Sequence, residues 1–465
     1  MKPNFLFILM DDLGWRDLSV YGSTFYETPH LDRLAARGMR FTDGYASCPV
    51  CSPSRASIMS GKYPARVGVT DWIDWGGGWH PMRGRLIDAP YCKALPQSEV
   101  SIATALREGG YRTWHIGKWH LGGPGHLPTQ HGFDVNVGGC EWGMPLKGYF
   151  SPYGIPVMTD GPTGEYLPER LTDEAVALLR QKSDKPFFLN LWHYLVHTPI
   201  QAKPDRVAYF ADKAKAMGLD ILPALEEGEH FPMERKRTQR VTRRLIQSDP
   251  VYAAMVFHMD ESIGRLISVL EETGQMDNTY IIFTSDNGGL ATAEGSPTTN
   301  RPLQEGKGWM YDGGTRVPLL VAGPGIAAGS VCSDCVTSTD FNPTMISLAG
   351  LPLRPQQHCV GESIVPLLRG TGRLQREAIY WHYPHYGNQG GTPGASIRMG
   401  DYKLIEFFED NHVELYNLRT DIAEAHDLAH EEPQQAATLL ARLHAWQASV
   451  CAKQPQMNPE WRDDG

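Results

Sequence analysis

The sequence predicts an α/β fold with a large domain, in which helices flank a mostly parallel central sheet, and a small C-terminal α+β domain. Three observations predict it. The 465 residues exceed what one hydrophobic core usually serves. Short apolar runs alternate with helical patterns, which is typical of parallel sheets. Near residue 370 this alternation of apolar runs and helical patterns ends. We therefore expect a first domain over 1–368 and a second over 369–465.

Five short apolar runs are the expected strands of the central sheet: Phe5–Met10, Tyr111–Ile116, Pro186–Trp192, Tyr280–Ser285 and Val317–Ala322. Four amphipathic segments are the expected helices: His30–Arg37, Ser101–Glu108, Thr172–Arg180 and Tyr252–Thr273. Polar or glycine-bearing residues follow most of these strands. Ligands of open α/β sheets bind at the carboxyl ends of strands, so we expect the site at that edge.

The C-terminal part has a different pattern. Short segments such as 401–408 (DYKLIEFF) alternate with turns, which predicts antiparallel strands. A helix follows at about 433–450, with apolar positions on one face at Leu439, Leu440, Leu443 and Trp446. Together they predict an antiparallel sheet covered by one helix.

Charge excludes one class of partner. The formal net charge is −10, which argues against broad nucleic-acid binding through phosphates. An anionic small substrate would need a local nest of cations. The basic run at 234–245 (ERKRTQRVTRRL) is interpreted as a solvated helix face, with a landing surface for a polyanionic chain as the alternative.

No targeting or membrane segment is evident in the chain as given. The apolar run Phe5–Met10 is shorter than the core of a signal peptide, and two aspartates follow it. No apolar stretch approaches the roughly 18 residues of a membrane span. We expect no membrane span, and a cytoplasmic location unless a trimmed export signal sent the protein to the periplasm or outside.

Eight cysteines include two CxxC pairs, Cys48/Cys51 and Cys332/Cys335. The pairs lie far further apart than those of zinc ribbons, so scattered buried thiols are expected. Cys51 differs from Cys48 in its C-terminal neighbours. Ser52 can cap a helix and Gly61 can end it, which places Cys51 just ahead of an anion-favouring helix N-terminus. A thiolate nucleophile is one interpretation, but it would need a partnering base.

Hard oxygen ligands follow two of the strands: Asp11, Asp12, Asp286 and Asn287. Taken singly, Asp-Asp and Ser-Asp-Asn-Gly-Gly are ordinary turn sequences. Both at one sheet edge, with an anion-binding helix between them in sequence, favour a Ca²⁺ site, with Mg²⁺ possible.

Residues 51–64 (CSPSRASIMSGKYP) resemble the signature of type I sulfatases, the formylglycine-dependent branch of the alkaline phosphatase superfamily. The segments NFLFILMDDLGW, GYRTWHIGKWHLG and IIFTSDNGG extend the likeness to bacterial carbohydrate sulfatases and arylsulfatase A-like enzymes. The resemblance implies an alkaline phosphatase-like fold and a sulfuric ester hydrolase. It also implies a maturation enzyme that oxidises the cysteine of Cys-x-Pro-x-Arg to Cα-formylglycine, and therefore Cys51 rather than Cys48.

The resemblance also implies residue roles. Asp11, Asp12, Asp286, Asn287 and position 51 would hold the cation, and Asp286 would take the proton of the attacking hydroxyl at position 51. Arg55, Lys118 and Lys307 would stabilise the sulfate oxygens. His197 with Lys307 would protonate the leaving oxygen, and His120 would deprotonate the second hydroxyl. His193, His258 and Asp260 are expected to be structural.

Aromatic residues in glycine-bearing loops favour a sulfated saccharide as substrate. The candidates are Trp72, Trp75, Trp79, His80, Trp142, His382 and His385. The stretch GFDVNVGG…GYFSPY resembles carbohydrate sulfatases of the polysaccharide-degrading type, which implies galactose or N-acetylgalactosamine as the sugar type. Two alternatives stay open. One is a phosphomonoester or phosphodiester hydrolase of the same superfamily, and the other is a silent sulfated-glycan-binding protein in which Cys51 is never oxidised.

Overall fold

A computed structural model describes residues 2–462. Its main sheet has eight strands in the order β12-β2-β11-β10-β1-β7-β5-β6. Their bounds are β1 (Asn4–Met10), β2 (Met39–Phe41), β5 (Arg112–Gly117), β6 (Val135–Val137), β7 (Phe187–Trp192), β10 (Thr279–Ser285), β11 (Leu319–Ala322) and β12 (Ser330–Cys332). The five predicted strands are all present within two residues of their expected ends.

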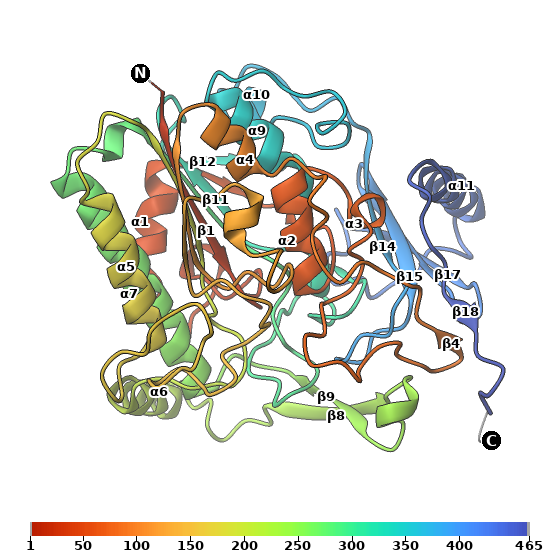
Figure 1. Ribbon diagram of the computed structural model, residues 1–465. Helices are drawn as coiled ribbons and strands as arrows, with labels where there is room; N and C mark the ends of the chain where they lie inside the picture. Colours follow the sequence, from red (N-terminus) through yellow and green to blue (C-terminus); the bar gives the residue numbers. More distant parts are fainter. Residues whose placement is uncertain (1, 463–465) are drawn as a thin grey trace.

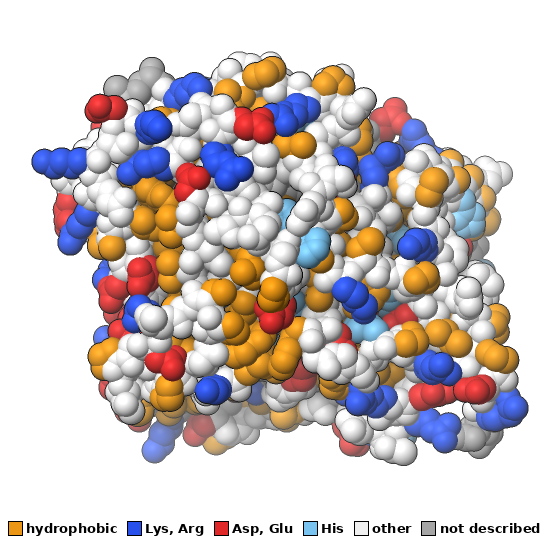
Figure 2. Space-filling model, viewed as in Figure 1, with side chains coloured by type: hydrophobic (Ala, Val, Ile, Leu, Met, Phe, Trp, Pro, Cys, Tyr) orange, Lys and Arg blue, Asp and Glu red, His pale blue; other side chains and the backbone are white. Residues whose placement is uncertain are grey.

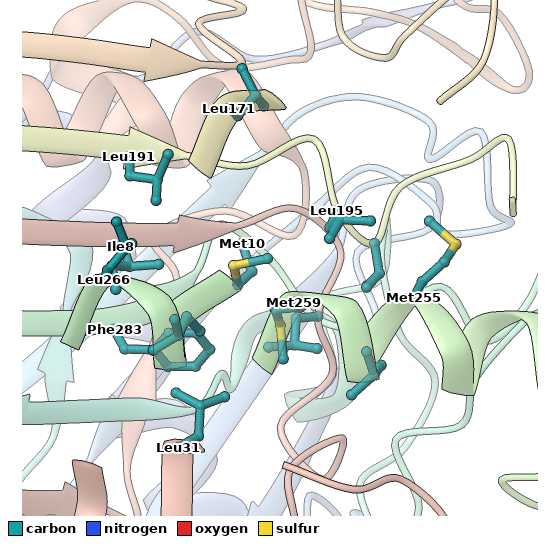
Figure 3. Close-up of a cluster of buried hydrophobic side chains, with 14 of the residues drawn as sticks. Ile8, Met10, Leu31, Leu171, Leu191, Leu195, Met255, Met259, Leu266 and Phe283 are labelled. Atoms are coloured by element: carbon teal, nitrogen blue, oxygen red, sulfur yellow. The ribbon is translucent and has the colours of Figure 1, made fainter. Parts of the chain in front are cut away.

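Strand β1 lies in the middle of the sheet and is buried on both faces, because its side chains alternate between two cores. Leu6, Ile8 and Met10 pack on one side, and Phe5, Phe7 and Leu9 pack on the other. Figure 3 shows the first core, where Ile8 and Met10 face side chains of helix α7 such as Met259 and Leu266. This continuous apolar run is what a central strand covered on both faces requires.

Helices cover the two faces of the sheet (Figure 1). One face carries α1 (Pro29–Arg37), α5 (Leu167–Leu179), α6 (Pro204–Ala216) and α7 (Pro250–Glu272). The other carries α2 (Cys51–Ser60), α4 (Ile102–Glu108) and α9 (Phe341–Leu348). Short helices α3 (Pro64–Val67), α8 (Asp312–Thr315) and α10 (Val365–Leu368) lie in the connections. Four of the long helices start with proline in the first turn, where its missing N–H costs nothing.

The sheet is mixed at one side. β10, β1, β7, β5 and β6 run parallel, whereas β11 is antiparallel to both β10 and β2. The carboxyl ends of β1, β5, β7 and β10 therefore share one edge, but β11 ends at the opposite one. Met10 and Ser285 pair in register, so the residues that follow β1 and β10 start side by side.

The C-terminal sheet is four-stranded and antiparallel, as predicted, in the order β14-β15-β16-β17. Its strands are β14 (Ala378–Tyr383), β15 (Gly394–Met399), β16 (Tyr402–Phe407) and β17 (Val413–Asn417), and α11 (Pro433–Ser449) covers it. Figure 1 shows this unit at the right, beside the main sheet. Helix α10 ends at Leu368 and β14 begins at Ala378, and the domain boundary at 368/369 remains a prediction.

Small pairs complete the fold: β3 (Gly44–Tyr45) with β13 (Val336–Thr337), and β4 (Leu86–Ile87) with β18 (Gln456–Met457). The predicted basic helix at 234–245 is wrong. That segment forms the 3₁₀ turn Glu234–Lys236 and strand β9 (Arg240–Arg244), which pairs with β8 (Leu225–His230). Strand pairing with acidic β8 satisfies these arginines, since Arg243 bonds Glu229 at 2.7 and 2.8 Å.

Acidic and basic side chains are interspersed over the face shown in Figure 2 rather than gathered by sign. Between residues 2 and 462, none of the helices combines the length and apolarity needed to cross a bilayer. The expectation of buried thiols is only partly right, because Cys92, Cys359 and Cys451 are exposed.

Candidate active site

Backbone hydrogen bonds between neighbouring strand ends bring four loops together at the carboxyl edge of the parallel strands. Asp11 N–H donates to Leu195 O at 2.8 Å, and Lys118 N–H donates to Trp192 O at 2.7 Å. Asp286 N–H donates to Met10 O at 3.1 Å. The residues that follow β1, β5, β7 and β10 are thus held in fixed positions beside one another.

Helix α2 delivers Cys51 to this edge. The helix begins at Cys51 itself, and all ten of its residues are buried. Ser52 is not its cap, which corrects the prediction: the Ser52 hydroxyl donates to His120 O at 2.8 Å and accepts from Ile73 N–H at 3.1 Å. Gly61 ends the helix with φ 73°, as its sequence position predicted. Ser52 therefore ties the start of the helix to two other loops of the site.

Two cationic and two acidic side chains form a buried network of ion pairs next to Cys51. Arg55 Nε and Nη2 both lie 2.8 Å from Asp286 Oδ2. Lys118 Nζ donates to Asp11 Oδ2 at 2.6 Å. All four side chains are fully buried. Such pairs are held rigidly, since a buried charge without its partner is costly.

A second group comes from the loop before α8. Lys307 Nζ donates to Asp12 Oδ2 at 2.8 Å and to His197 Nε2 at 2.9 Å. Burial opposes the charge on Lys307, but the Asp12 carboxylate and Cys51 outweigh it and hold the pKa of Lys307 well above its usual value. His197 Nδ1 lies 2.9 Å from its own neighbour's carbonyl, Thr198 O. The tautomer that fits these contacts has its proton on Nδ1 and accepts from Lys307 at Nε2.

The arrangement fits a divalent cation. Ligand atoms of Asp11, Asp12, Cys51 and His197 all lie within 4.8 Å of one another. Asp11 Oδ1 and Asn287 Oδ1 are buried without a hydrogen-bond partner. Burial raises the pKa of Asp11 to about 8 despite Lys118 beside it. Partnerless buried oxygens of this kind are what a hard cation would complete.

Asp286 and Asn287 join this group through hydrogen bonds. Asp286 Oδ1 accepts from Asp12 N–H at 3.3 Å, and Asn287 Nδ2 donates to Asp12 Oδ1 at 2.9 Å. Asp286 is not within the set of mutually close ligand atoms, because Arg55 engages its other oxygen. His197, expected only as an acid, is within that set.

His120 lies on the other side of Cys51. Its Nε2 donates to Ile73 O at 2.9 Å, which leaves Nδ1 as a lone pair that is buried and without a partner. Burial, with Lys118 adding to it, holds the pKa of His120 well below its usual value. The ring is therefore neutral, with an open acceptor atom.

These groups open into a cavity of about 500 Å³. Its lining includes Cys51, His120, His197 and Lys307, together with Trp72, Trp75 and Trp79 from the predicted aromatic loop. Trp75 is 49% exposed at the rim. Trp142 packs against it, with ring centroids 5.9 Å apart, so these tryptophans form an aromatic wall.

Three histidines predicted to contact the substrate lie elsewhere. His80, His382 and His385 are absent from the lining of this cavity. His382 is buried against Lys453 O, 2.8 Å from its Nε2. His80 and His385 turn toward Asp71 and Asp88. His193, expected to be structural, is fully buried and bonds Ser262.

Sequence reasoning missed a polar wall of the cavity formed by Lys236, Glu294, Asn388 and Gln389. Asn388 and Gln389 amides both donate to Glu294 Oε1, at 2.8 and 3.1 Å, and Lys236 Nζ donates to Asn388 O at 2.8 Å. The only sequence signal was the basic run containing Lys236. The wall joins three distant segments, which no local pattern reveals.

Comparison with known proteins gives two family matches. The model described as Sulfatase matches residues 3–351. The model described as N-sulphoglucosamine sulphohydrolase, C-terminal, matches residues 305–449.

Relatives match over most of the chain. A sulfatase of Formosa agariphila is 30% identical, over 96% of this chain and 88% of its own. Human N-acetylgalactosamine-6-sulfatase is 32% identical, over 82% of this chain and 68% of its own. The crystal structure of Ps i-CgsB in complex with k-i-k-neocarrahexaose superimposes with a TM-score of 0.77 at 28% identity, covering 99% of this chain and 95% of that chain.

Proposed function

Because the chain belongs to the sulfatase family and is thus a sulfuric ester hydrolase, we propose that it cleaves the sulfate ester of a sulfated sugar, with residue 51 as the reacting group of the protein. The observation that carries this proposal is the buried charge cluster around Cys51 opening into a cavity walled by tryptophans. Aromatic faces pack against sugar rings, and the charge cluster provides the cations that a sulfate needs. Galactose or N-acetylgalactosamine is the sugar type that we propose, supported by the names of the relatives.

The charge balance of the site favours an anionic substrate once a cation is present. Once a cation keeps Asp11 ionised, Asp11, Asp12 and Asp286 oppose Arg55, Lys118 and Lys307, three charges against three. A divalent cation on the free oxygens of Asp11 and Asn287 would leave the site net positive. A sulfate group entering beside Cys51 would then be attracted rather than repelled.

Two groups complete the proposed chemistry: formylglycine at position 51 supplies a hydroxyl nucleophile when hydrated, and the cation, Ca²⁺ or Mg²⁺, supplies positive charge to the sulfate. The chain's own residues hold the reacting groups in position and supply the proton for the leaving oxygen. Arg55 is locked onto Asp286 by two contacts, so its charge is fixed before substrate arrives, as preorganised stabilisation requires. Asp286 Oδ1 and Asp12 are positioned by the same network.

The leaving oxygen needs a proton, and Lys307 is the proton-bearing group of the charge cluster that lines the cavity beside Cys51. It donates to His197 Nε2, so His197 holds Lys307 in place and shares its proton. Charge on Asp12 raises the pKa of Lys307, so a cation bound to Asp12 would lower that pKa and make Lys307 a better acid. On the opposite wall, His120 Nδ1 has the free lone pair to accept a proton from position 51.

Phosphoester hydrolysis is the second candidate, because a phosphate has the same tetrahedral oxygens. The cation site here offers carboxylate and amide oxygens with a single histidine, whereas zinc-dependent sites of such hydrolases are richer in histidine. Parallel assays with an aryl sulfate and the matching aryl phosphate separate the two. We expect a preference for sulfate of at least about tenfold in kcat/KM.

The test of the modification is the mass of the tryptic peptide spanning Phe41–Arg55. We expect an aldehyde at position 51 and an intact thiol at Cys48. A protein with both thiols intact that is still fully active on the sulfated sugar would overturn the proposal. An inactive protein with both thiols, which gains activity and the aldehyde on co-expression with a maturation enzyme, would support it.

A further inference from the structure

A second buried cluster of metal-ligand side chains lies away from the proposed catalytic cluster. Asp71, His80 and Asp88 come from the loop that carries the tryptophans, and His385 follows β14 of the C-terminal sheet. Ligand atoms of the first three lie within 4.8 Å of one another. His385 and Asp71 are fully buried, and the other two side chains are at most 6% exposed.

Asp71, His80 and Asp88 have the spacing of a metal site, and His385 lies beside the same two carboxylates. His80 Nδ1 lies 3.5 Å from Asp71 Oδ2 and 3.2 Å from Asp88 Oδ2. His385 Nδ1 lies 3.7 Å from Asp71 Oδ2 and 3.6 Å from Asp88 Oδ1. Ligand atoms about 2.0–2.1 Å from a tetrahedral zinc ion are about 3.3–3.4 Å from each other. Three of these separations are longer than a good hydrogen bond and near that value, whereas the fourth, between His80 Nδ1 and Asp88 Oδ2, is also short enough for a hydrogen bond.

The atoms that point inward lack partners, whereas the atoms behind them are held. Asp71 Oδ2 and His385 Nδ1 are buried without a hydrogen-bond partner. Asp71 Oδ1 accepts from Trp72 N–H at 2.8 Å and from Tyr383 OH at 2.9 Å. His385 Nε2 lies 2.9 Å from the Thr70 hydroxyl. In these two residues the outer atoms are bonded and the inner atoms are free, which is how proteins orient metal ligands. His80 differs, because its Nδ1 bonds Asp88 and its Nε2 is buried without a partner.

Asp88 is held by backbone donors on both of its oxygens. Its Oδ2 accepts from Met82 N–H at 2.7 Å, and its Oδ1 accepts from Tyr386 N–H at 3.3 Å. The cation of Lys93 does not enter the cluster, because its Nζ lies over the Tyr91 ring, 3.6 Å from the centroid. Two buried carboxylates thus face two imidazoles, and a divalent ion is the group that would balance them.

We propose that Asp71, His80, Asp88 and His385 bind a divalent transition-metal ion, for which zinc has the matching ligand set and spacing. Two imidazoles disfavour Ca²⁺ and Mg²⁺, which select oxygen ligands. The site is distinct from the cation site at Asp11 and Asp12, and it does not depend on the proposed sugar substrate.

The ion links the cavity wall to the C-terminal sheet. Asp71 and His80 flank Trp72, Trp75 and Trp79, whereas His385 follows β14. Two residues after Asp71, Ile73 N–H donates to Ser52, and Ile73 O accepts from His120. The metal therefore anchors a loop that contacts both the aromatic wall and the start of helix α2. Losing it is expected to loosen the loop and weaken sugar binding.

The direct test is metal content of the intact protein, purified without chelator and dialysed against zinc, by mass spectrometry and by anomalous scattering at the zinc edge. We expect about one zinc per chain, with the anomalous peak between His80 and His385. His80→Gln and His385→Gln should each lose the zinc. The matched control is His382→Gln, a buried histidine on neighbouring β14 that should keep it.

Thermal unfolding supplies a readout if one variant folds poorly. A chelator selective for transition metals should lower the Tm of the unaltered protein and of His382→Gln, but not that of His80→Gln. A folded, zinc-dialysed protein that binds no transition metal, or that holds equal zinc in His80→Gln, would overturn the proposal. The two histidines would then balance the carboxylates as imidazolium ions.

Discussion

Two lysines of this molecule are completely buried, and each pairs with an aspartate, yet their surroundings differ. Lys403 Nζ, on β16, lies 2.8 Å from both Asp312 and Glu424. Lys118 Nζ, after β5, lies 2.6 Å from Asp11. In both cases burial of the ammonium is tolerated only because a carboxylate faces it.

Around Lys403 most of the hydrogen-bonding capacity is used by the protein, although Glu424 Oε1 meets Lys403 only as an ion pair. Asp312 also accepts from Tyr45 OH at 2.8 Å, and Glu424 accepts from Asp312 N–H at 2.7 Å. Although burial alone would raise it, Lys403 and the nearby arginines lower the pKa of Asp312 to about 2. This closed network joins the C-terminal sheet to helix α8.

Around Lys118 part of the hydrogen-bonding capacity is not used by the protein. Asp11 Oδ1 and Asn287 Oδ1 have no hydrogen-bond partner, and the cavity opens beside them at Cys51. The comparison teaches that burial and pairing do not distinguish a functional charge cluster from a structural one. What distinguishes the Lys118 cluster is that its unpartnered oxygens lie beside an open cavity.

The strongest test of this contrast is Cys51→Ala. We expect sulfatase turnover to fall by more than about 10³-fold, because removing a nucleophile leaves only binding and electrostatic effects. The free energy of unfolding should stay within about 1 kcal/mol, since the small side chain forms no ion pair in the folded state. Steady-state kinetics and denaturant unfolding check both. Turnover that survives would remove position 51 from the mechanism.

Lys403→Met should have the next largest effect, and on stability alone. It leaves Asp312 and Glu424 buried without their lysine, which costs about 3–5 kcal/mol. Chemical denaturation measures this loss. The folded fraction should keep its kcat, because Lys403 does not line the cavity; a large fall in kcat at full folding would contradict the structural role.

Lys118→Met is the matched change at the other lysine. We expect kcat to fall by about 10²–10³-fold, the usual cost of removing a preorganised charge. In the cation-loaded protein the loss of stability should be less than half that of Lys403→Met, because the bound cation still faces Asp11. Equal destabilisation by the two variants would contradict the proposed difference between the Lys118 and Lys403 clusters.

His197→Ala sharpens the contrast within the cavity. A sugar is a poor leaving group and needs the proton that His197 and Lys307 hold, so turnover of a sulfated sugar should fall by about 10²-fold. An aryl sulfate with an acidic phenol should lose less than about tenfold. Kinetics on both substrates with one enzyme preparation decide the point, and equal losses would exclude a role in leaving-group protonation.

Asp260 is a buried carboxyl with backbone partners in place of a lysine, since it accepts from His30 and Leu31 N–H at 2.9 and 2.8 Å. Burial raises its pKa from 3.8 to about 7. The folded state then holds the proton more tightly than the unfolded state, so stability falls as pH rises from about 4 to 7. The Asp260→Asn variant should lack this pH-dependent change in the free energy of unfolding, which is at most about 1.4 kcal/mol per pH unit. Unfolding at several pH values checks it, and identical pH profiles would contradict it.

Much of this architecture was predictable from sequence because the signals are local. Apolar runs bounded by polar residues located the strands to within two residues, and the groups after β1 and β10 could be placed at one edge by topology alone. The closing helix followed from its apolar face. Family resemblance added the roles of Cys51 and Arg55, which spacing alone does not specify.

The failures are all long-range. The direction of β11 depends on its pairing with β10 and β2, and the 234–245 segment becomes a strand because acidic β8 pairs with it. His80 and His385 have aromatic neighbours in sequence, so they were assigned to sugar binding. Asp71 and Asp88 meet His385 only when the C-terminal sheet packs beside the loop, and His80 meets them through the folding of the loop itself.

The central position of β1 also delays completion of the site during synthesis of the chain, because β10 must pair with it. Its neighbour β10 ends at Ser285, 234 residues after Cys51. At about 5–20 residues per second, a ribosome needs roughly 12 to 47 s to cover that distance. Until then Asp286 is missing, Arg55 has no carboxylate to engage, and helix α2 cannot be enclosed. Once β10 docks, all ten residues of α2 are sealed inside. If a maturation enzyme modifies Cys51 before this burial, slower translation leaves it more time and is expected to give a more completely modified protein.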